Sequence, residues 1–223
     1  KVVLDNHCSL GIAYDGDGDR CLAVDEEGNE IDGDKILAII SNYLKSKGKL
    51  KNNTVVATVM SNLGLKKYGA NNGIDIVQTK VGDRYVLEEM LKNGYNLGGE
   101  QSGHVIMLDY NPTGDGILTS LMLIRAILES GKRASEVASI MRAYPQVLVN
   151  AKVANEKKFD FDKDEEIVNE IKSLEKEFEG NGRVLIRTSG TEPLVRVMLE
   201  GEDSQYLKTK AENLAALISK KLG

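Results

Sequence analysis

The segment Asp15-Gly16-Asp17-Gly18-Asp19-Arg20 separates two apolar stretches that read as β-strands, Leu10-Gly11-Ile12-Ala13-Tyr14 and Cys21-Leu22-Ala23-Val24-Asp25. Glycine permits tight turns, so the three Asp side chains can converge on one point. Converged carboxylates repel one another, and a hard divalent cation offsets that repulsion. The segment therefore predicts a metal site between two strands, and the alternative is a solvated acidic turn.

A calcium loop of the EF-hand type is a second interpretation of the same residues. Counted from Asp15, the other two aspartates and Glu26 fall on ligand positions of such a loop. However, Arg20 stands where the sharp turn requires glycine, and both flanks read as strands instead of helices. We therefore favour the strand–loop–strand site.

The composition is that of an ordinary globular chain, with 223 residues, 41% hydrophobic and 28% charged. A net charge of −5 argues against a nucleic-acid partner, and no apolar run is long enough to predict a membrane partner. The only cysteines, Cys8 and Cys21, form neither a disulfide framework nor a zinc set. We expect a cytoplasmic protein whose partners are small molecules.

The remaining periodicity divides the chain into three parts. We predict a strand remnant at residues 1–6, a helix at 33–44, and a polar linker at 45–53. Strands at 54–60, 74–81, 95–97 and 105–108 alternate with helices at 62–68, 83–92, 116–129 and 134–143. After Tyr144-Pro145 the order becomes strand 147–153, helix 163–178, strands 183–187 and 194–200, and helix 205–222.

This order predicts an α/β plus α+β fold. Residues 1–51 would be a partial α/β domain with the acidic loop, and 52–145 a complete, mostly parallel three-layer α/β/α domain. Residues 146–223 would form a β-α-β-β-α domain with an antiparallel hairpin. We find no internal repeat in the sequence.

A second loop whose side chains suit ligand binding is Gly98-Gly99-Glu100-Gln101-Ser102-Gly103-His104, at the end of a predicted strand. Ligands of open α/β sheets bind at such ends. Glu100 can accept hydrogen bonds from two sugar hydroxyls, and Ser102 can add a third contact. His104 could move a proton near neutral pH, although a capped core histidine is an equal alternative.

A third loop joins the two last strands and reads Arg187-Thr188-Ser189-Gly190-Thr191-Glu192-Pro193, with Arg196 on the outgoing strand. Two hydroxyls, a loose backbone and two guanidiniums together suit a dianion such as phosphate. The alternative is a polar hairpin turn. At the start of another helix, Lys80 and Arg84 could also face a phosphate, although charges there are usually solvated.

The three motifs DGDGDR, GGEQSGH and RTSGTEPLVRVM, in this order, resemble those of the α-D-phosphohexomutase superfamily. The resemblance implies that Asp15, Asp17 and Asp19 bind Mg²⁺ with a phosphoserine oxygen. Further implied roles are Arg20 beside that phosphoserine, Glu100 and Ser102 on sugar hydroxyls, and His104 near the reacting oxygen. The residues implied to hold the phosphate that is not transferred are Arg187, Ser189, Gly190, Thr191 and Arg196.

The activity that the resemblance implies is an isomerase reaction of carbohydrate metabolism. A phosphoserine gives its phosphoryl group to the sugar, and a hexosamine 1,6-bisphosphate intermediate turns around before the other phosphate is taken back. Gln101 and the Ser-Gly-Thr-Glu-Pro form of the third loop resemble the branch that interconverts glucosamine 6-phosphate and glucosamine 1-phosphate, for UDP-N-acetylglucosamine and peptidoglycan. Relatives that act on mannose or glucose phosphates, and a non-catalytic Ca²⁺- or phosphosugar-binding module, are the alternatives.

One departure from the family is large. The nucleophilic serine of such enzymes lies in a Ser-His-Asn-Pro type loop of the first domain, and this sequence contains no such stretch. The resemblance covers only the C-terminal half of a four-domain enzyme. We therefore expect the chain to hold metal and sugar phosphate without turning over, and we leave a homodimer open.

Overall fold

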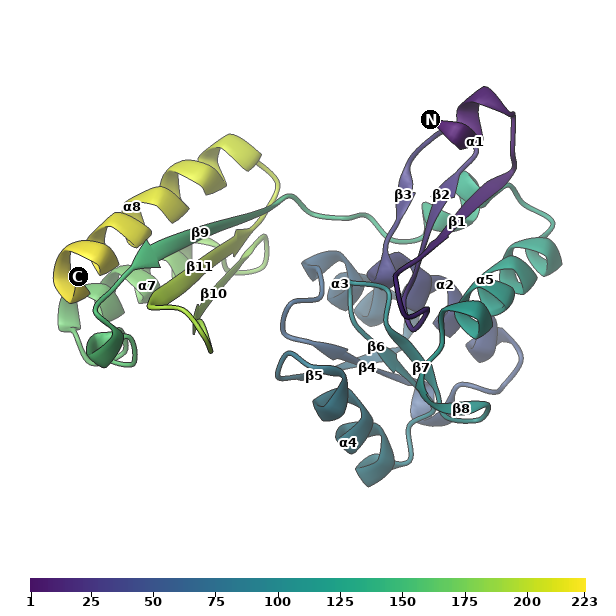
Figure 1. The fold of residues 1–223 in the computed structure, drawn as a ribbon, viewed down its shortest axis with the longest axis horizontal. Helices are drawn as coiled ribbons and strands as arrows, with labels where there is room; N and C mark the ends of the chain where they lie inside the picture. The colour runs from purple at the N-terminus through teal and green to yellow at the C-terminus, as the bar shows by residue number, and fades with distance from the viewer. The chain divides into compact units, whose positions relative to one another are not determined.

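The computed structural model describes residues 1–223, which form two compact units, Lys1–Ala143 and Tyr144–Gly223 (Figure 1). The first unit contains two sheets and the second unit one, and each unit has its own apolar core. The predicted division of the first unit near residue 51 stays a prediction. None of the helices combines the length and the apolar character that crossing a bilayer requires.

The acidic loop closes a small antiparallel sheet in the first unit, with the strand order β1-β2-β3. The strands are β1 Leu10–Tyr14, β2 Cys21–Asp25 and β3 Glu30–Ile31. Tyr14 pairs with Cys21, so the six residues between them form the loop at the end of a hairpin. Strands on both flanks exclude the helix–loop–helix arrangement of an EF-hand.

The expected strand at residues 1–6 is wrong, because α1 Val2–Asp5 forms a short helix there. The strand order places β1 at the edge of its sheet, and no strand pairs with residues 1–6. This segment instead satisfies backbone groups locally, with the Asp5 N–H donating to the Lys1 carbonyl at 2.9 Å.

The main sheet of the first unit has five strands in the order β5-β4-β6-β7-β8. They are β4 Thr54–Thr58, β5 Asp75–Thr79, β6 Leu97–Gly99, β7 Val105–Met107 and β8 Asn111–Gly114. β4 is parallel to β5 and β6, whereas β7 is antiparallel to β6 and β8. Half of the pairs are thus antiparallel, so the sheet is mixed and not mostly parallel as predicted, because the loop between β6 and β7 is too short for a parallel crossover.

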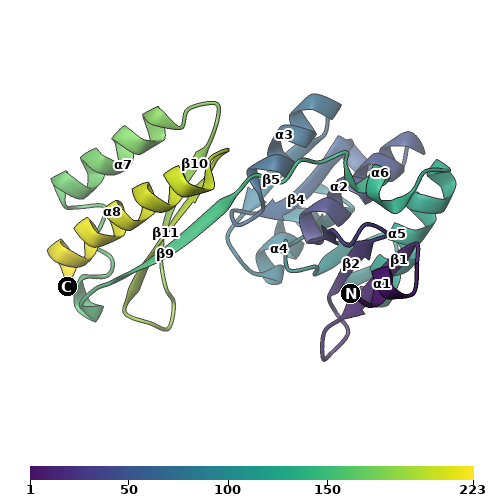
Figure 2. The same cartoon turned by 90° about the horizontal axis from the view of Figure 1, so that it is seen from above.

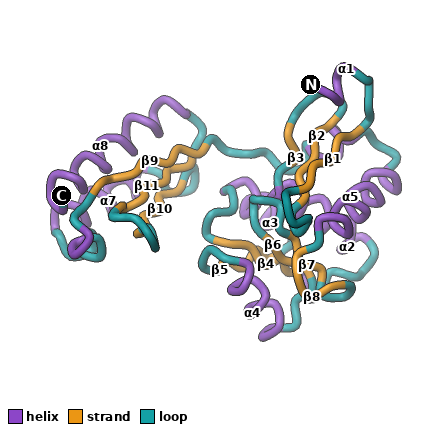
Figure 3. The backbone as a smooth tube through the Cα atoms, in the orientation of Figure 1, coloured by secondary structure: helices purple, strands orange, loops and turns teal.

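Helices cover both faces of this sheet (Figures 1, 2 and 3). They are α2 Gly33–Ser46, α3 Leu63–Asn72 and α4 Asp83–Asn93, with a 3₁₀ turn at Lys51–Asn53. Two more helices, α5 Gly116–Ser130 and α6 Ala134–Ala138, pack against α2 and the small sheet. Along β4, Val55 and Ala57 enter the core under α2, whereas Val56 packs with α4 through Val86. This alternation gives the three layers that the sequence predicted.

The second unit has the predicted β-α-β-β-α order. Its elements are β9 Gln146–Lys152, a 3₁₀ turn at Asn155–Lys157, α7 Glu165–Glu177, β10 Arg183–Thr188, β11 Leu194–Glu200 and α8 Ser204–Leu222. The sheet is antiparallel in the order β10-β11-β9, and α7 and α8 lie on one of its faces (Figure 2). Val195 and Val197 enter the core with these helices, so Arg196 between them points to the other face. The α/β plus α+β class is confirmed.

Two stretches of the first unit, β2 to α2 and β7 to α5, have the same order of elements, although the sequence shows no internal repeat. Each has two short strands, an Asp N-cap, a glycine at the first helical position, and a long helix, either α2 or α5. The glycine N–H of each stretch binds a loop of the other: Gly33 donates to the Gln101 carbonyl and Gly116 to the Gly18 carbonyl, both at 3.0 Å. The repeat escaped the sequence analysis because few side chains match outside the Asp-Gly pairs.

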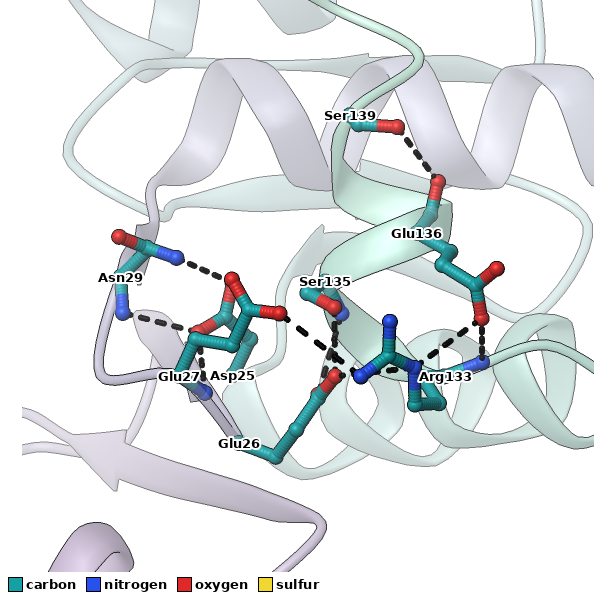
Figure 4. A network of polar contacts seen from close by, with 8 residues as sticks. All are labelled: Asp25, Glu26, Glu27, Asn29, Arg133, Ser135, Glu136 and Ser139. Carbon is teal, nitrogen blue, oxygen red and sulfur yellow. Dashed lines mark hydrogen bonds and ion pairs between the residues drawn. The ribbon is translucent and has the colours of Figure 1, made fainter.

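A polar network fixes the turn after β2 to the start of α6 (Figure 4). The Glu26 carboxylate accepts hydrogen bonds from the Ser135 hydroxyl and from the Ser135 N–H at 3.1 Å. Arg133 lies 3.8 Å from Glu26 and also pairs with Glu136 at 3.3 Å. The hydrogen bond from the Ser135 hydroxyl lowers the pKa of Glu26. This network attaches one end of the hairpin to α6, and the hydrogen bond from Gly116 to Gly18 attaches the other end, which carries the acidic loop.

The close approach of the two repeated stretches gives a testable prediction. A Cβ on Gly33 would lie 2.1 Å from the Glu100 carbonyl oxygen and 2.7 Å from the Gly103 nitrogen, both backbone atoms. Gly33→Ala should therefore lower the free energy of unfolding by about 2–4 kcal/mol in urea titrations. The control is Gly16→Ala, where a Cβ meets nothing within 4 Å, and it should change stability by less than about 0.5 kcal/mol. Equal stability of the two variants would contradict the prediction.

Candidate functional site

The three aspartates of the acidic loop converge. One ligand atom from each of Asp15, Asp17 and Asp19 can be chosen so that all lie within 4.8 Å of one another. Asp15 accepts hydrogen bonds from the N–H groups of Gly18 and Arg20, both at 3.1 Å, and from the Arg20 Nε at 2.7 Å. Asp19 has a buried Oδ1 without a hydrogen-bond partner. The cluster thus has unsatisfied anionic oxygens, which a hard cation would satisfy.

Arg20 compensates part of this negative charge. Partial desolvation raises the pKa of Asp15, but the hydrogen bonds from the Arg20 backbone and guanidinium outweigh it and lower the pKa to about 2. The same contact raises the pKa of Arg20. Arg20 thus fixes Asp15 in its ionised form at neutral pH.

The acidic loop lies directly beside the Gly98–His104 segment. Arg20 and His104 form an antiparallel bridge, and the Cys21 N–H donates to the Gly103 carbonyl at 3.1 Å. The His104 side chain is buried, with its Nε2 at 3.6 Å from Asp19 Oδ2 and its Nδ1 without a partner. Two motifs that are more than 80 residues apart in the sequence therefore share one backbone contact.

Glu100 and Ser102 occupy different environments in this second loop. Glu100 Oε1 accepts a hydrogen bond from the Gly82 N–H at 3.1 Å, which is possible because Gly82 has φ +128°. Ser102 is exposed and lines a hollow of about 590 Å³ together with Leu22 and Lys35. The Ser102 hydroxyl has no hydrogen-bond partner within the chain and remains available to a ligand.

Gln101 has a structural role in the fold. Its Nε2 donates to Asp32 Oδ2 at 3.2 Å, and Asp32 is the N-cap of α2. The residue that resembled one branch of the family thus supports the helix start that the second loop packs against.

Lys80 and Arg84 do not converge on a common point. Arg84 is highly exposed and forms an ion pair with Glu88 one turn further along α4, at 2.8 Å. Lys80 is exposed and its Nζ lies 6.0 Å from the centre of the Tyr85 ring. The role predicted for Lys80 in phosphate binding stays a prediction.

The third loop brings its two arginines side by side. Arg187 on β10 pairs directly with Arg196 on β11, and Asn150 on β9 is the next residue across the sheet. The Nε atoms of both arginines are buried without a hydrogen-bond partner. Burial first, and the charge of Arg196 second, lower the pKa of Arg187. Like charges directly opposite each other destabilise a sheet, so the pair favours an anion between them.

The loop tip is shaped by Ser189. Its N–H donates to the Leu194 carbonyl at 2.9 Å, and its hydroxyl accepts from the Glu192 N–H at 3.3 Å. Gly190 and Thr191 are exposed, and a Cβ on Gly190 would meet nothing within 4 Å. The backbone of the tip is thus open to a ligand.

Sequence reasoning missed several neighbours of these loops. Asp83 Oδ2 lies 4.0 Å from His104 Nε2, and Gly114 packs against the imidazole, since its Cβ would be 2.2 Å from that nitrogen. Lys158 donates to the Ser189 carbonyl at 3.3 Å. Glu192 accepts from Arg196 Nη2 at 3.2 Å. Glu192 lies within a quoted motif and Asp83 directly precedes Arg84, whereas Gly114 and Lys158 come from distant segments without a local signal.

Comparison with known proteins identifies the family. The model of the phosphoglucomutase/phosphomannomutase alpha/beta/alpha domain III matches residues 32–144, and that of the phosphoglucomutase/phosphomannomutase C-terminal domain matches residues 148–217. These two models cover most of the chain. The chain therefore belongs to the phosphoglucomutase/phosphomannomutase family.

The chain is also similar to curated phosphoglucosamine mutases. It is 59% identical over 222 residues to that of Caldicellulosiruptor saccharolyticus and 62% identical over 219 residues to that of Clostridium acetobutylicum. The alignments cover 100% and 98% of this chain, respectively, but 49% of each relative. The chain thus spans about half the length of the curated relatives it matches.

Solved structures share the fold at lower identity. A complex of Aspergillus fumigatus N-acetylphosphoglucosamine mutase with GlcNAc-6P and magnesium matches 95% of this chain and 49% of its own, with a TM-score of 0.75 at 22% identity. An N-acetylglucosamine-phosphate mutase of the alpha-D-phosphohexomutase superfamily, in its substrate complex, matches 94% of this chain and 48% of its own, with a TM-score of 0.77 at 21% identity. These likenesses confirm the fold.

The Asp15–Arg20 contact predicts an unusually acidic carboxyl group. Its pKa of about 2 lies below the ordinary value of 3.8. The stabilisation that this shift provides is therefore fully present above about pH 4 and is lost as the pH falls toward 2. A titration followed by carboxyl-carbon NMR should show the low midpoint for Asp15. Arg20→Gln should raise this midpoint part of the way toward 3.8, because the backbone N–H of residue 20 still donates to Asp15. A midpoint that does not change in this variant would contradict a contribution from the Arg20 guanidinium.

Proposed function

We propose that this chain is the metal-binding and phosphosugar-recognition half of a phosphoglucosamine mutase. The whole enzyme would interconvert glucosamine 6-phosphate and glucosamine 1-phosphate through a phosphoserine and a bisphosphate intermediate. The observation that carries the proposal is the direct pairing of Arg187 with Arg196, whose buried Nε donors lack partners. A phosphate dianion supplies both the charge and the acceptor oxygens that this pair lacks.

Mg²⁺ is the metal that we propose for the acidic loop. The fit rests on the three converging carboxylates and on the buried Oδ1 of Asp19, which accepts no hydrogen bond and lies 3.7 Å from Arg20 Nε. Oxygen ligands suit a hard cation, and Arg20 neutralises only part of the negative charge of the cluster through its contact with Asp15. When bound, the metal would act as a Lewis acid on the phosphoryl group that is transferred. Holding the cation is the role of Asp15, Asp17 and Asp19.

The Gly98–His104 loop would bind the sugar hydroxyls beside this metal. Glu100 uses Oε1 to accept the Gly82 N–H, which leaves its other oxygen for a sugar hydroxyl, and Ser102 can contribute another hydrogen bond. His104 and Arg20 would stand nearest to the reacting groups, because the backbone bridge holds them together. A buried imidazole with a free Nδ1 can accept or hold a proton there.

The third loop would hold the phosphate that is not transferred. Arg187 and Arg196 would supply the charge, and Ser189, Gly190 and Thr191 the hydroxyl and backbone donors. The names of the relatives support glucosamine phosphate as the sugar, because those relatives are called phosphoglucosamine mutases. On this proposal the product would serve UDP-N-acetylglucosamine and peptidoglycan synthesis.

Several parts of the proposal rest on the family alone. No Ser-His-Asn-Pro stretch is present, so we expect no turnover by this chain, and a phosphoserine would come from another part of the longer enzyme. The assignment of residues 1–51, 52–145 and 146–223 to a second, third and fourth domain belongs to the same proposal. The cytoplasmic location and a homodimer stay predictions.

The phosphate loop is tested by binding of glucosamine 6-phosphate to the chain, measured by calorimetry. Arg187→Ala should weaken binding by about 1.5–3 kcal/mol, the range for hydrogen bonds to charged groups. The control is Arg125→Ala, which removes an exposed guanidinium from α5 in the other unit. Binding that is equally strong in the wild type and in both variants would exclude the third loop as the phosphate site.

The metal site is tested in the same way with Mg²⁺ alone. Asp17→Asn removes one of the three converging carboxylates and should weaken binding by at least about tenfold, or 1.4 kcal/mol. Asp75→Asn is the control, because Asp75 is exposed on β5 and does not belong to the cluster. If both variants bind Mg²⁺ as the wild type does, the acidic loop is not the metal site.

A further inference from the structure

The third loop contains one carboxylate that the proposed function does not use. Glu192 lies at the hairpin tip, between the exposed Thr191 and Pro193. Its Oε2 accepts from Arg196 Nη2 at 3.2 Å and lies 3.5 Å from the Ser189 hydroxyl. The negative charge is thus placed among the groups that would hold a phosphate.

The charges around the loop are unevenly paired. Arg187 and Arg196 are direct cross-strand neighbours, and Lys158 is bound to the Ser189 carbonyl. Glu192 contacts only Arg196 among these three cations, through a single nitrogen, and the Arg187 Nε has no partner. One carboxylate therefore satisfies the site incompletely, whereas a dianion can engage both guanidiniums at once.

The Glu192 carboxylate and a bound phosphate cannot both keep these positions. Each would be an anion on Arg196, and two anions so close repel strongly where water is partly excluded. Glu192 is the group that can move, because its side chain is 53% exposed whereas that of Arg196 is 29% exposed. The tip around Gly190 is also open, which leaves room for the side chain to turn outward.

We propose that Glu192 is an internal competitor for the phosphate site, a carboxylate that occupies Arg196 when the loop is empty and yields it when phosphate binds. The inference rests on the proposed function of this loop and adds its regulation. A mutase whose bisphosphate intermediate turns around must release the held phosphate in every cycle. A carboxylate that pairs with Arg196 as the phosphate leaves lowers the free-energy cost of that release. It also limits the affinity of the site for phosphate.

The experiment is calorimetric titration of the chain with inorganic phosphate, at a mildly alkaline pH where phosphate is largely dianionic. Glu192→Gln keeps the shape and removes the charge, so phosphate affinity should rise by about threefold to tenfold, since the variant loses both an ion pair and a repulsion. The matched control is Glu212→Gln, which removes an exposed carboxylate from α8 of the same unit and should leave the affinity unchanged.

A double-variant cycle separates competition from a structural effect of Glu192. Because the competitor acts through Arg196, the gain in phosphate affinity from Glu192→Gln should become clearly smaller when Arg196→Gln is already present, since only the relief of direct repulsion then remains. Unchanged or weaker binding by the single variant Glu192→Gln would overturn the inference and would show that the carboxylate positions Arg196 for the ligand. If the wild-type chain binds no phosphate, the proposed function of the loop fails, and the inference falls with it.

Discussion

The first unit depends on the backbone contact between two loops that are distant in sequence. The Cys21 N–H binds the Gly103 carbonyl, and Arg20 bridges His104. Around this contact, each long helix begins against the loop of the other stretch, at a glycine where a side chain would collide with backbone atoms. Because these hydrogen bonds join backbone to backbone, the positions of the acidic cluster and of the Gly98–His104 loop are set by the fold itself.

Each unit contains a cluster of like charges that is only partly neutralised, negative in the first unit and positive in the second. In the first, three carboxylates converge and Arg20 compensates them only partly, through a close ion pair with Asp15 and a longer one with Asp19. In the second, two guanidiniums are paired across a sheet, and only Arg196 is compensated, by Glu192. In both cases the chain provides one partial counter-charge and leaves the rest for a ligand. Such arrangements cost stability, and their persistence at loops is typical of binding sites.

Features that depend on neighbours in the sequence were predictable. The acidic cluster and the arginine hairpin follow from short patterns, and the three layers around the five-stranded sheet follow from the alternation of strands and helices. Features that depend on distant contacts were not predictable. The short strands β3 and β8 lack an apolar run, and the contact between α2 and α5 has no local signal. Gln101 was interpreted as a mark of substrate choice, whereas the structure gives it a partner in the cap of α2.

Native-state amide hydrogen exchange tests most directly whether the two loops of the first unit form one rigid site. The amides of Cys21, Gly33 and Gly116 donate the hydrogen bonds that join the two stretches. They should be protected to the same extent and should exchange only through a common opening of the unit, with equal dependence on denaturant. Fast exchange of Gly33 or Cys21 while the β4 amides remain protected would show that the loops move independently, and would contradict a single preformed site.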